Sequence, residues 1–260
     1  MHINNGFGWT FNMQAERYDK MRPGYVEELY SDIFRLIPVN AQSNVVEIGI
    51  GSGQATRPIL ETGCKLTAIE YGDQLAELCR TKFSQYPRFS VITSKFEDCP
   101  WEENTCDLIY AATAFHWIPE EIGYPKVFEM LKSGGVCARF ANHPYKDKER
   151  EALHQDIQKL YAVYMPGSRS ANEFSNEQAK SIAEIAGQYG FVNINWKLYH
   201  RTRSFSAQEY VQLLGTYSNH LAIEENTRKK FFSEIETAIN DHGGQITLYD
   251  TIDLELAQKP

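Results

Sequence analysis

The chain has 260 residues, of which 42% are hydrophobic and 23% charged, and its formal net charge is −8. This composition is ordinary for a globular protein and allows one sizeable core. The negative charge disfavours a nucleic-acid partner, because proteins that follow a phosphate backbone usually carry stripes of lysine and arginine.

The spacing of the cysteines and the length of the apolar runs bear on metal binding, cellular compartment and membrane association. The five cysteines form no Cys-x-x-Cys pair and no cysteine–histidine cluster at zinc spacing, so we expect no metal site and a reducing compartment. The segment MHINNGFGWT lacks the pattern of a signal peptide, and no apolar run approaches the roughly 20 residues that span a bilayer. We therefore expect a soluble cytoplasmic protein with no membrane partner, and the sequence leaves its oligomeric state open.

Strands and helices alternate through the first half of the chain. Residues 24–37 carry apolar side chains at helical spacing, and Pro38 ends this helix. Five strand segments follow, at 45–48, 65–70, 89–94, 106–113 and 136–142. The helices between them are expected at 56–61, 74–86 and 121–132, the last one interrupted by Pro125 and stopped by Ser133-Gly134-Gly135.

The second half of the chain mixes helices with two long strands. Helical patterns cover 147–165, 175–189, 207–218 and 224–241, and extended patterns cover 191–205 and 246–258. The two late strands are expected to pair antiparallel at the edge of a sheet, and the helices are expected to build a lid over a pocket.

The alternation predicts an α/β fold with a parallel, doubly wound sheet and right-handed crossovers. In such sheets the ligand binds at the carboxyl ends of the strands. We expect a single domain over residues 1–260, with a cofactor-binding core at 40–142. Helical cap elements are expected at about 1–37, 147–190 and 207–241.

The segment VVEIGIGSGQATRPIL, at 45–60, joins a strand to a helix through glycines at alternate positions. These are Gly49, Gly51 and Gly53, and the third comes one position too early for the dinucleotide fingerprint Gly-x-Gly-x-x-Gly. Glu47 would repel a pyrophosphate and attract an ammonium group. Glu70 lies 21 residues after Gly49 and could accept hydrogen bonds from both hydroxyls of a ribose. Together they favour a nucleoside with a cationic, phosphate-free tail, such as S-adenosylmethionine.

Five pieces of the sequence occur in the order of a known family: VVEIGIGSG, Glu70, SKFEDCPW (94–101), CDLIYAATAFHWI (106–118) and LKSGGV (131–136). In these pieces the chain resembles the class I S-adenosylmethionine-dependent methyltransferases over roughly residues 12–142. YDKMRPGY (18–25) and AFHWI (114–118) are similar to the small-molecule branch that includes trans-aconitate methyltransferase-like proteins. The resemblance implies a Rossmann-like, mostly parallel sheet with an antiparallel edge and the strand order 3-2-1-4-5-7-6.

The resemblance also implies roles in cofactor binding. Glu47 and the three glycines would surround the methionine part of S-adenosylmethionine, and Glu70 would hold the ribose. The remaining cofactor residues implied are Tyr71, packed on the adenine, Phe96, offering its backbone N–H to that ring, and Ala111, facing the methionine end through its backbone. Lys95 stands where the family often has an aspartate that binds the adenine amino group, so this contact is not expected here.

The candidate catalytic and substrate-binding residues each allow a structural role as well as a functional one. His116 and Trp117 follow the strand at 106–113, close to the expected position of the methyl group. His116 either makes a structural hydrogen bond or orients and deprotonates an acceptor, since an unperturbed histidine pKa of about 6.5 suits both roles. Trp117 either packs in the core or lines the substrate site.

Further candidates for substrate binding or a lid lie near the two ends of the chain. Tyr18 and Arg22 either fix the N-terminal segment or close over the site, where Arg22 could meet a carboxylate. His220 is a candidate near the end of a late helix. Arg201 and Arg203 belong to a solvated face or, if they point inward, suit an acidic substrate.

The predicted activity is methyl transfer from S-adenosylmethionine to a small molecule. Because no acid–base pair is evident, and a carboxylate acceptor needs no base, O-methylation of a carboxylate is slightly favoured. Two alternatives are a non-catalytic protein that binds S-adenosylmethionine and, with less support, a nicotinamide-dependent oxidoreductase.

Overall fold

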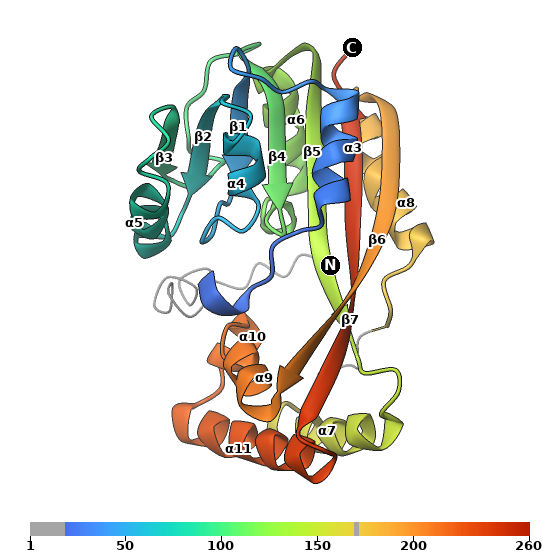
Figure 1. Ribbon diagram of the computed structural model, residues 1–260. Helices are drawn as coiled ribbons and strands as arrows, with labels where there is room; N and C mark the ends of the chain where they lie inside the picture. The colour runs from blue at the N-terminus through green and yellow to red at the C-terminus, as the bar shows by residue number, and fades with distance from the viewer. Residues whose placement is uncertain (1–18, 169–171) are drawn as a thin grey trace.

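The computed structural model describes residues 19–168 and 172–260, and within them seven strands form one sheet in the order β3-β2-β1-β4-β5-β7-β6 (Figure 1). The strands β1 to β5 are parallel, whereas β7 runs antiparallel to both of its neighbours. This confirms the expected fold and strand order. The strand bounds are β1 Asn44–Ile48, β2 Lys65–Glu70, β3 Phe89–Thr93, β4 Cys106–Ala112, β5 Leu131–Tyr145, β6 Val192–Ser206 and β7 Gln245–Gln258.

Helices cover both faces of the sheet because its central strands are apolar on both sides. In β1, Val45 contributes to the core on one face and Val46 to the core on the other, as expected for a parallel sheet buried between helices. The face of Val45 carries α3 (Glu27–Leu36), α4 (Thr56–Leu60) and α5 (Asp73–Lys82), and the face of Val46 carries α6 (Glu120–Met130).

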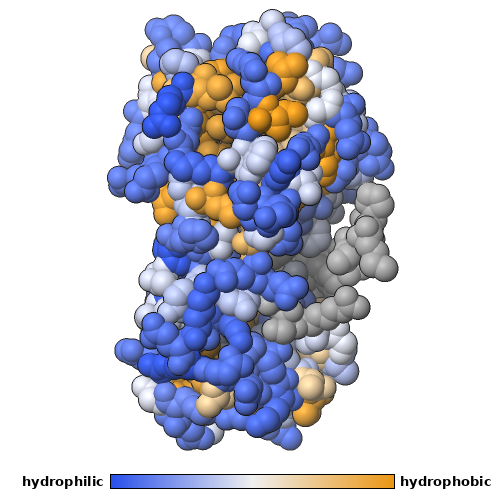
Figure 2. All heavy atoms as spheres, turned by 90° about the vertical axis from the view of Figure 1, so that its right-hand side faces the viewer, coloured by the Kyte–Doolittle hydropathy of each residue, from blue (hydrophilic) through white to orange (hydrophobic). Residues whose placement is uncertain are grey.

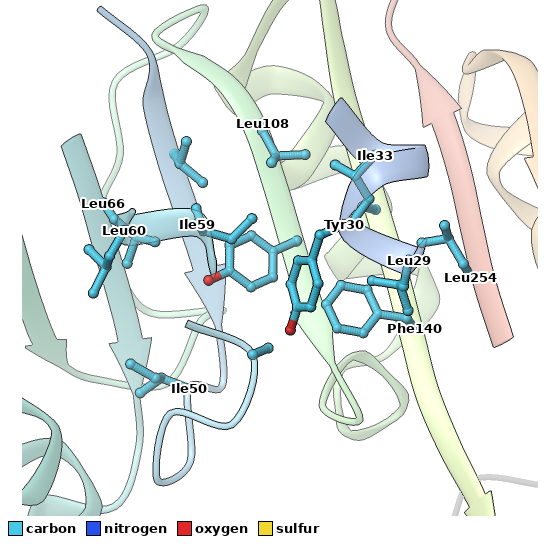
Figure 3. Close-up of a cluster of buried hydrophobic side chains, with 14 of the residues drawn as sticks. Leu29, Tyr30, Ile33, Ile50, Ile59, Leu60, Leu66, Leu108, Phe140 and Leu254 are labelled. Atoms are coloured by element: carbon cyan, nitrogen blue, oxygen red, sulfur yellow. The ribbon is translucent and has the colours of Figure 1, made fainter. Parts of the chain in front are cut away.

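The core on the α3 face is organised around Phe140 of β5. Tyr110 of β4 stacks on the Phe140 ring with 6.0 Å between centroids, and Tyr30 of α3 meets the same ring edge-on at 6.4 Å. Figure 3 shows Tyr30, Leu29 and Ile33 of α3 pointing from their helix towards the sheet. The apolar stripe of α3 therefore binds this helix to the centre of the sheet.

Three long strands carry a separate helical layer, which we call the cap. The strands β5, β6 and β7 continue well past the carboxyl ends of β1 and β4, and the cap is attached to their extensions (Figure 1). It consists of α7 (Glu151–Tyr164), α9 (Ala207–Leu214), α10 (Ser218–Leu221) and α11 (Glu225–Asp241). These helices share a core of their own, with Leu153, Leu213 and Phe231 fully buried. The space between the sheet and the cap faces the glycine turn.

The cap is smaller than the sequence suggested. The expected cap segment 1–37 includes α3, but Leu29 and Ile33 bury that helix against the sheet. The segment 147–190 includes α8 (Asn176–Ile185) and the short 3-10 helix η2 (Ala186–Tyr189), which pack on β6, β7 and α6. Figure 2 looks onto the side that carries α8 and β6 and shows a largely hydrophilic cap below a more apolar upper half.

The predicted boundaries around the fifth strand are wrong. The helix expected at 121–132 ends at Met130, and Gly134 and Gly135 lie in an irregular stretch of β5, where the pairing with β4 shifts register. The fifth strand extends past 142 to Tyr145. Pro144 fits there because β4 pairs with β5 only as far as Phe140, so the side of β5 that lacks the Pro144 N–H has no neighbour.

Candidate active site

The glycine turn between β1 and α4 has a backbone that only glycine adopts easily. Gly49, Gly51 and Gly53 have φ angles of 66°, 58° and 81°, in the left-handed region. A Cβ at Gly49 would lie 2.6 Å from the Cβ of Ala114, and one at Gly53 would lie 2.4 Å from Cε2 of Phe83. Two of the three positions therefore exclude any side chain. Glycine at these positions lets the turn lie against Ala114, just past the end of β4, and against Phe83.

Glu70, at the end of β2, supports the glycine turn directly. Its Oε2 accepts a hydrogen bond from the Gly51 N–H at 2.8 Å, and its Oε1 accepts one from the Gly72 N–H at 2.8 Å. Burial raises the pKa of this carboxyl, and the backbone N–H groups act in the opposite direction. Each carboxylate oxygen has a second lone pair, so Glu70 can hold both turns and still accept a ligand hydroxyl.

Glu47 lies below the turn rather than beside the expected ligand. It is 1% exposed, and the hydroxyls of Thr56 and Tyr110 both donate to its Oε2 at 2.7 Å. Burial raises the pKa of Glu47 to about 8, the largest effect, while the two hydroxyls oppose it. At neutral pH this group is largely protonated, which weakens the attraction for an ammonium group that the sequence suggested.

The expected adenine side lies at the carboxyl ends of β2 and β3. Tyr71 is 57% exposed, and the Nζ of Lys95 lies 5.6 Å from the centroid of its ring. Phe96 is buried, and its carbonyl accepts a hydrogen bond from Nζ of Lys126 at 2.6 Å. Lys126 also donates to the carbonyl of Glu97 at 3.0 Å, so an ammonium group from α6 fixes this loop.

A pocket opens between the glycine turn and the cap. Gly49 and Gly51 line one side, and Ala112 and Thr113 at the end of β4 line the floor. Ala111, the residue expected there, is 2% exposed and faces the core on the α6 side, so its neighbour Ala112 lines the pocket. Gln54, which directly follows the turn, also lines the pocket, and the far walls come from residues that are distant in sequence: Arg22, Tyr25, Asn142, Pro144, Arg203 and Tyr217.

Thr113 has a strained backbone at this site. Its φ angle is 54°, which is rare for a β-branched residue. The hydroxyls of Thr113 and Tyr25 are hydrogen-bonded at 2.7 Å, and the Thr113 N–H donates to the Phe140 carbonyl at 2.7 Å. These bonds hold the end of β4 in an unfavourable conformation next to the glycine turn, as is common at functional sites.

The segment 19–25 crosses between the sheet and the cap. Arg22 donates from Nε to Oγ1 of Thr216 at 3.0 Å and from Nη2 to the Thr216 carbonyl at 2.9 Å, and its guanidinium lies over the ring of Tyr217. Arg22 thus joins this segment to the cap and lines the pocket. Tyr18, the other candidate from this segment, lies outside the described residues.

His116 and Trp117 lie on the opposite side of β4 from the pocket. They form the short 3-10 helix η1 (Phe115–Trp117) and are exposed, with 5.1 Å between their rings. Desolvation by neighbouring atoms lowers the pKa of His116, and the positive charge of Arg139 lowers it further. Neither side chain is among the described residues that line the pocket.

His220 belongs to the core of the cap. It is 4% exposed, and its Nε2 is hydrogen-bonded to the Tyr161 hydroxyl at 2.8 Å. Burial lowers the pKa of His220 to about 4, so the ring is neutral. The ring also lies parallel to Phe231, and the residue stabilises the cap instead of lining the pocket. Tyr217, three residues earlier, is the cap residue that reaches the pocket.

Arg201 and Arg203 point inward and share one carboxylate. Asp250 on β7 has a fully buried side chain, and both guanidiniums lie within 3.3 Å of it. Arg201 also donates to the Gly24 carbonyl and to Oδ1 of Asn142, each at 2.9 Å. The alternative of a solvated face is therefore wrong for this pair, and Arg203 reaches the pocket wall.

Comparison with known proteins places this geometry in a family. A family model described as "Methyltransferase domain" matches residues 45–135. An uncharacterized methyltransferase of Geobacillus thermodenitrificans is 30% identical over 158 residues, covering 57% of this chain and 71% of the relative. The chain belongs to the class I S-adenosylmethionine-dependent methyltransferases. It is a methyltransferase with S-adenosylmethionine as its cofactor, which decides against the nicotinamide-dependent alternative.

Two longer matches agree with this assignment. An uncharacterized methyltransferase of Schizosaccharomyces pombe is 24% identical to this methyltransferase over 235 residues, which cover 89% of this chain and 88% of the relative. The structure of phosphoethanolamine N-methyltransferase 2 from Haemonchus contortus superposes with a TM-score of 0.55 at 13% identity, covering 96% of this chain and 57% of that one. The second match supports the fold alone.

Several pocket residues of the methyltransferase were not found from the sequence. Thr113 gave no signal, because its left-handed conformation is imposed by contacts with Tyr25 and Phe140. Asn142 is the last residue of the strand expected at 136–142, and nothing in its neighbours showed that β5 continues past it along the pocket wall. Gln54 directly follows the third glycine and could have been assigned from that position alone.

The described residues contain neither a metal-binding cluster nor a membrane-spanning helix. No three histidine, cysteine, aspartate or glutamate side chains gather there in a way that could hold a metal ion. No helix within 19–168 and 172–260 is both long and apolar enough to cross a bilayer.

The raised pKa of Glu47 predicts a specific pH dependence of stability. The unfolded carboxyl ionises near its ordinary value, whereas the folded one keeps its proton up to about pH 8, so wild-type stability falls as pH rises between these values. In Glu47→Gln the amide oxygen can still accept from Thr56 and Tyr110. Between pH 5 and pH 8 we expect the free energy of unfolding of the wild type to fall by roughly 3 kcal/mol more than that of Glu47→Gln, since one pKa unit corresponds to about 1.4 kcal/mol.

Urea unfolding of both proteins at pH 5, 6, 7 and 8 measures the difference in slope. Other buried acids, such as Glu255, are present in both proteins and cancel in the comparison. Parallel stability curves would show that Glu47 is ionised in the fold and would restore its proposed attraction for an ammonium group.

Proposed function

We propose that this methyltransferase transfers the methyl group of S-adenosylmethionine to a small acidic molecule, with a carboxylate oxygen as the acceptor. The observation that carries the proposal is the pocket, which the glycine turn bounds on one side and an arginine of β6 bounds on the other. The net charge of −8 gives no support to a nucleic-acid substrate. The similarity to the trans-aconitate methyltransferase-like branch remains a prediction that fits this proposal.

The residues at the turn fit the cofactor. Ala114 and Phe83 leave no room for a Cβ at Gly49 or Gly53, so the turn presents bare backbone, and Glu70 retains lone pairs for the two ribose hydroxyls. Gly51 would approach the methionine part through its backbone, and Tyr71 and the Phe96 N–H would contact the adenine from the ends of β2 and β3. The Haemonchus enzyme, which shares the fold, was solved with S-adenosylhomocysteine. All five cysteines are free and buried, which supports a cytoplasmic location.

The chain's contribution to the reaction is alignment. When bound, S-adenosylmethionine supplies a methyl carbon that its sulfonium has already activated: the C–S bond breaks as the C–O bond forms. Thr113 and Ala112 at the end of β4 shape the place where the two reactants meet, and Arg22 and Tyr217 close it towards the cap. An ionised carboxylate needs no base, so the absence of His116 from the pocket wall is compatible with this acceptor.

Calorimetric titration of the purified protein with S-adenosylmethionine, S-adenosylhomocysteine and NAD tests the cofactor assignment. We expect saturable binding of the first two and none of the third. Gly51→Arg places a large side chain on the turn, at a φ of 58° that disfavours it, and should abolish binding although thermal unfolding shows a folded protein at the temperature of the titration. Unchanged affinity in Gly51→Arg would show that the cofactor lies elsewhere.

The role of His116 is tested by comparing the rates of methyl transfer in the wild type and in His116→Ala with an identified acceptor. For a carboxylate acceptor, His116→Ala should retain the rate of methyl transfer. Loss of turnover in His116→Ala, with cofactor affinity intact, would instead favour a protonated acceptor, such as a phenol or an amine, which His116 deprotonates.

A further inference from the structure

The guanidinium of Arg203 is held in a fixed orientation at the pocket wall. Its Nε lies 2.5 Å from Oδ2 of Asp250, and its Nη2 lies 3.0 Å from Oδ1. This two-point contact occupies one edge of the planar group. The side chain of Asp250 is fully buried, whereas that of Arg203 is 15% exposed and lines the pocket. The carboxylate therefore anchors Arg203 from the protein side and leaves its other edge towards the pocket.

The outer edge of Arg203 retains hydrogen-bond donors. The Nη1 atom makes no hydrogen bond to any of the described residues, and Nη2 has a second N–H beyond the one that Asp250 accepts. Two parallel N–H groups of this kind match the two oxygens of a carboxylate or phosphate. The neighbouring Arg201 differs, since its donors reach the Gly24 carbonyl, Asn142 and Asp250.

The local charge favours an anion at this edge. Two guanidiniums share the single carboxylate of Asp250, so the cluster of Arg201, Arg203 and Asp250 keeps one net positive charge. Glu47, the buried acid below the glycine turn, is largely protonated at neutral pH because burial raises its pKa to about 8. Arg22 lines the same pocket and adds further positive potential.

We propose that Arg203, oriented by Asp250, binds an anionic group of the methyl acceptor and selects acceptors that carry a carboxylate or a phosphate. The inference deepens the proposed function and depends on it. The group that Arg203 holds would be distinct from the oxygen that receives the methyl, so the acceptor would carry two polar ends. Arg203 would then set both the affinity for the acceptor and its orientation.

The test uses the protein saturated with S-adenosylhomocysteine and titrated with succinate, with inorganic phosphate, and with uncharged succinamide. We expect the wild type to bind at least one of the two anions and not succinamide. The anion that binds identifies a carboxylate or a phosphate as the recognised group. Arg203→Gln should weaken anion binding about 10- to 100-fold, the range for hydrogen bonds to a charged group. Its affinity for S-adenosylmethionine should change less than twofold.

Two further variants distinguish the hydrogen bonds of the Arg203 guanidinium from the effect of its charge, and melting temperatures distinguish both from unfolding. Arg203→Lys keeps the charge but not the planar edge, so its anion affinity should lie between those of the wild type and Arg203→Gln. Lys197→Gln removes one positive charge from the same strand, where Lys197 pairs with Asp32, and should leave anion binding unchanged. Melting temperatures of all variants identify any loss that comes from unfolding.

Three results would overturn the proposal. The wild type could bind neither anion, Arg203→Gln could bind anions as well as the wild type, or Arg203→Gln could lose cofactor and anion affinity equally. The last result would assign Arg203 to the carboxylate of the cofactor. Failure of the wild type to bind S-adenosylmethionine at all would instead refute the proposed function, so the two failures are distinguishable.

Discussion

Replacing Glu70 by alanine is expected to reduce the affinity for S-adenosylmethionine by at least about 100-fold. The carboxylate holds the N–H groups of Gly51 and Gly72, so the variant releases both turns at the mouth of the site. It also loses the proposed acceptor for the ribose hydroxyls. Hydrogen bonds to charged groups contribute about 1.5–3 kcal/mol each, and the loss of two corresponds to at least this factor.

Calorimetric titration gives the dissociation constants, and thermal unfolding shows whether Glu70→Ala remains folded. Glu70→Gln retains only one acceptor oxygen and should fall between the two proteins. Glu77→Ala is the matched control, because Glu77 lies on α5 with 70% of its side chain exposed and pairs only with Arg80 among the described residues. A folded Glu70→Ala protein with wild-type affinity would remove Glu70 from the cofactor site.

Replacing Phe140 by alanine should lower the free energy of unfolding by about 3–5 kcal/mol, the range for removing a buried phenylalanine. The ring is 3% exposed and contacts three tyrosines, of which Tyr25 is the nearest at 4.7 Å between centroids. Two of these tyrosines continue into the site: Tyr110 donates to Glu47, and Tyr25 is bonded to Thr113. The cavity should therefore also weaken cofactor binding.

Urea unfolding at a fixed pH measures the change, with Val163→Ala as the control because Val163 on α7 is 70% exposed. The control should stay within about 0.5 kcal/mol of the wild type. A loss below about 1 kcal/mol in Phe140→Ala would mean that the surrounding tyrosines collapse into the space and that Phe140 does not organise this core.

The glycine turn could be predicted because the signals that form it are local. Three glycines, an apolar strand before them and an acid at the end of the next strand lie within residues 45–70, and each has a conformational reason to be there. The parallel arrangement of the first five strands followed from their alternation with helices. The antiparallel pairing of the two late strands was expected from their pattern, whereas the strand order, with β7 between β5 and β6, came from the resemblance.

The positions of His220, His116 and Arg203 could not be read from the sequence in the same way. Whether Arg203 faces the pocket depends on the register of β6 against β7, which places Arg201 opposite Asp250 and Arg203 opposite Leu248. His220 lies in a helix of four residues, and its burial depends on Tyr161 from α7 and Phe231 from α11. These are contacts between segments far apart in the chain, and no local pattern encodes them.

The strand order has a consequence for the synthesis of the protein. Because β7 lies between β5 and β6, the edge strand β6 has no sheet neighbour until the residues of β7 have been made. A chain growing on the ribosome can assemble β1 to β5 with their helices as they emerge, but β6 must wait as an unpaired extended segment through the translation of α9, α10 and α11. Insertion of β7 between β5 and β6 then completes the sheet, and Ile246 and Leu248 of β7 complete the core of the cap. The nascent methyltransferase is therefore most exposed to aggregation, and most in need of a chaperone, in the interval between the synthesis of these two strands.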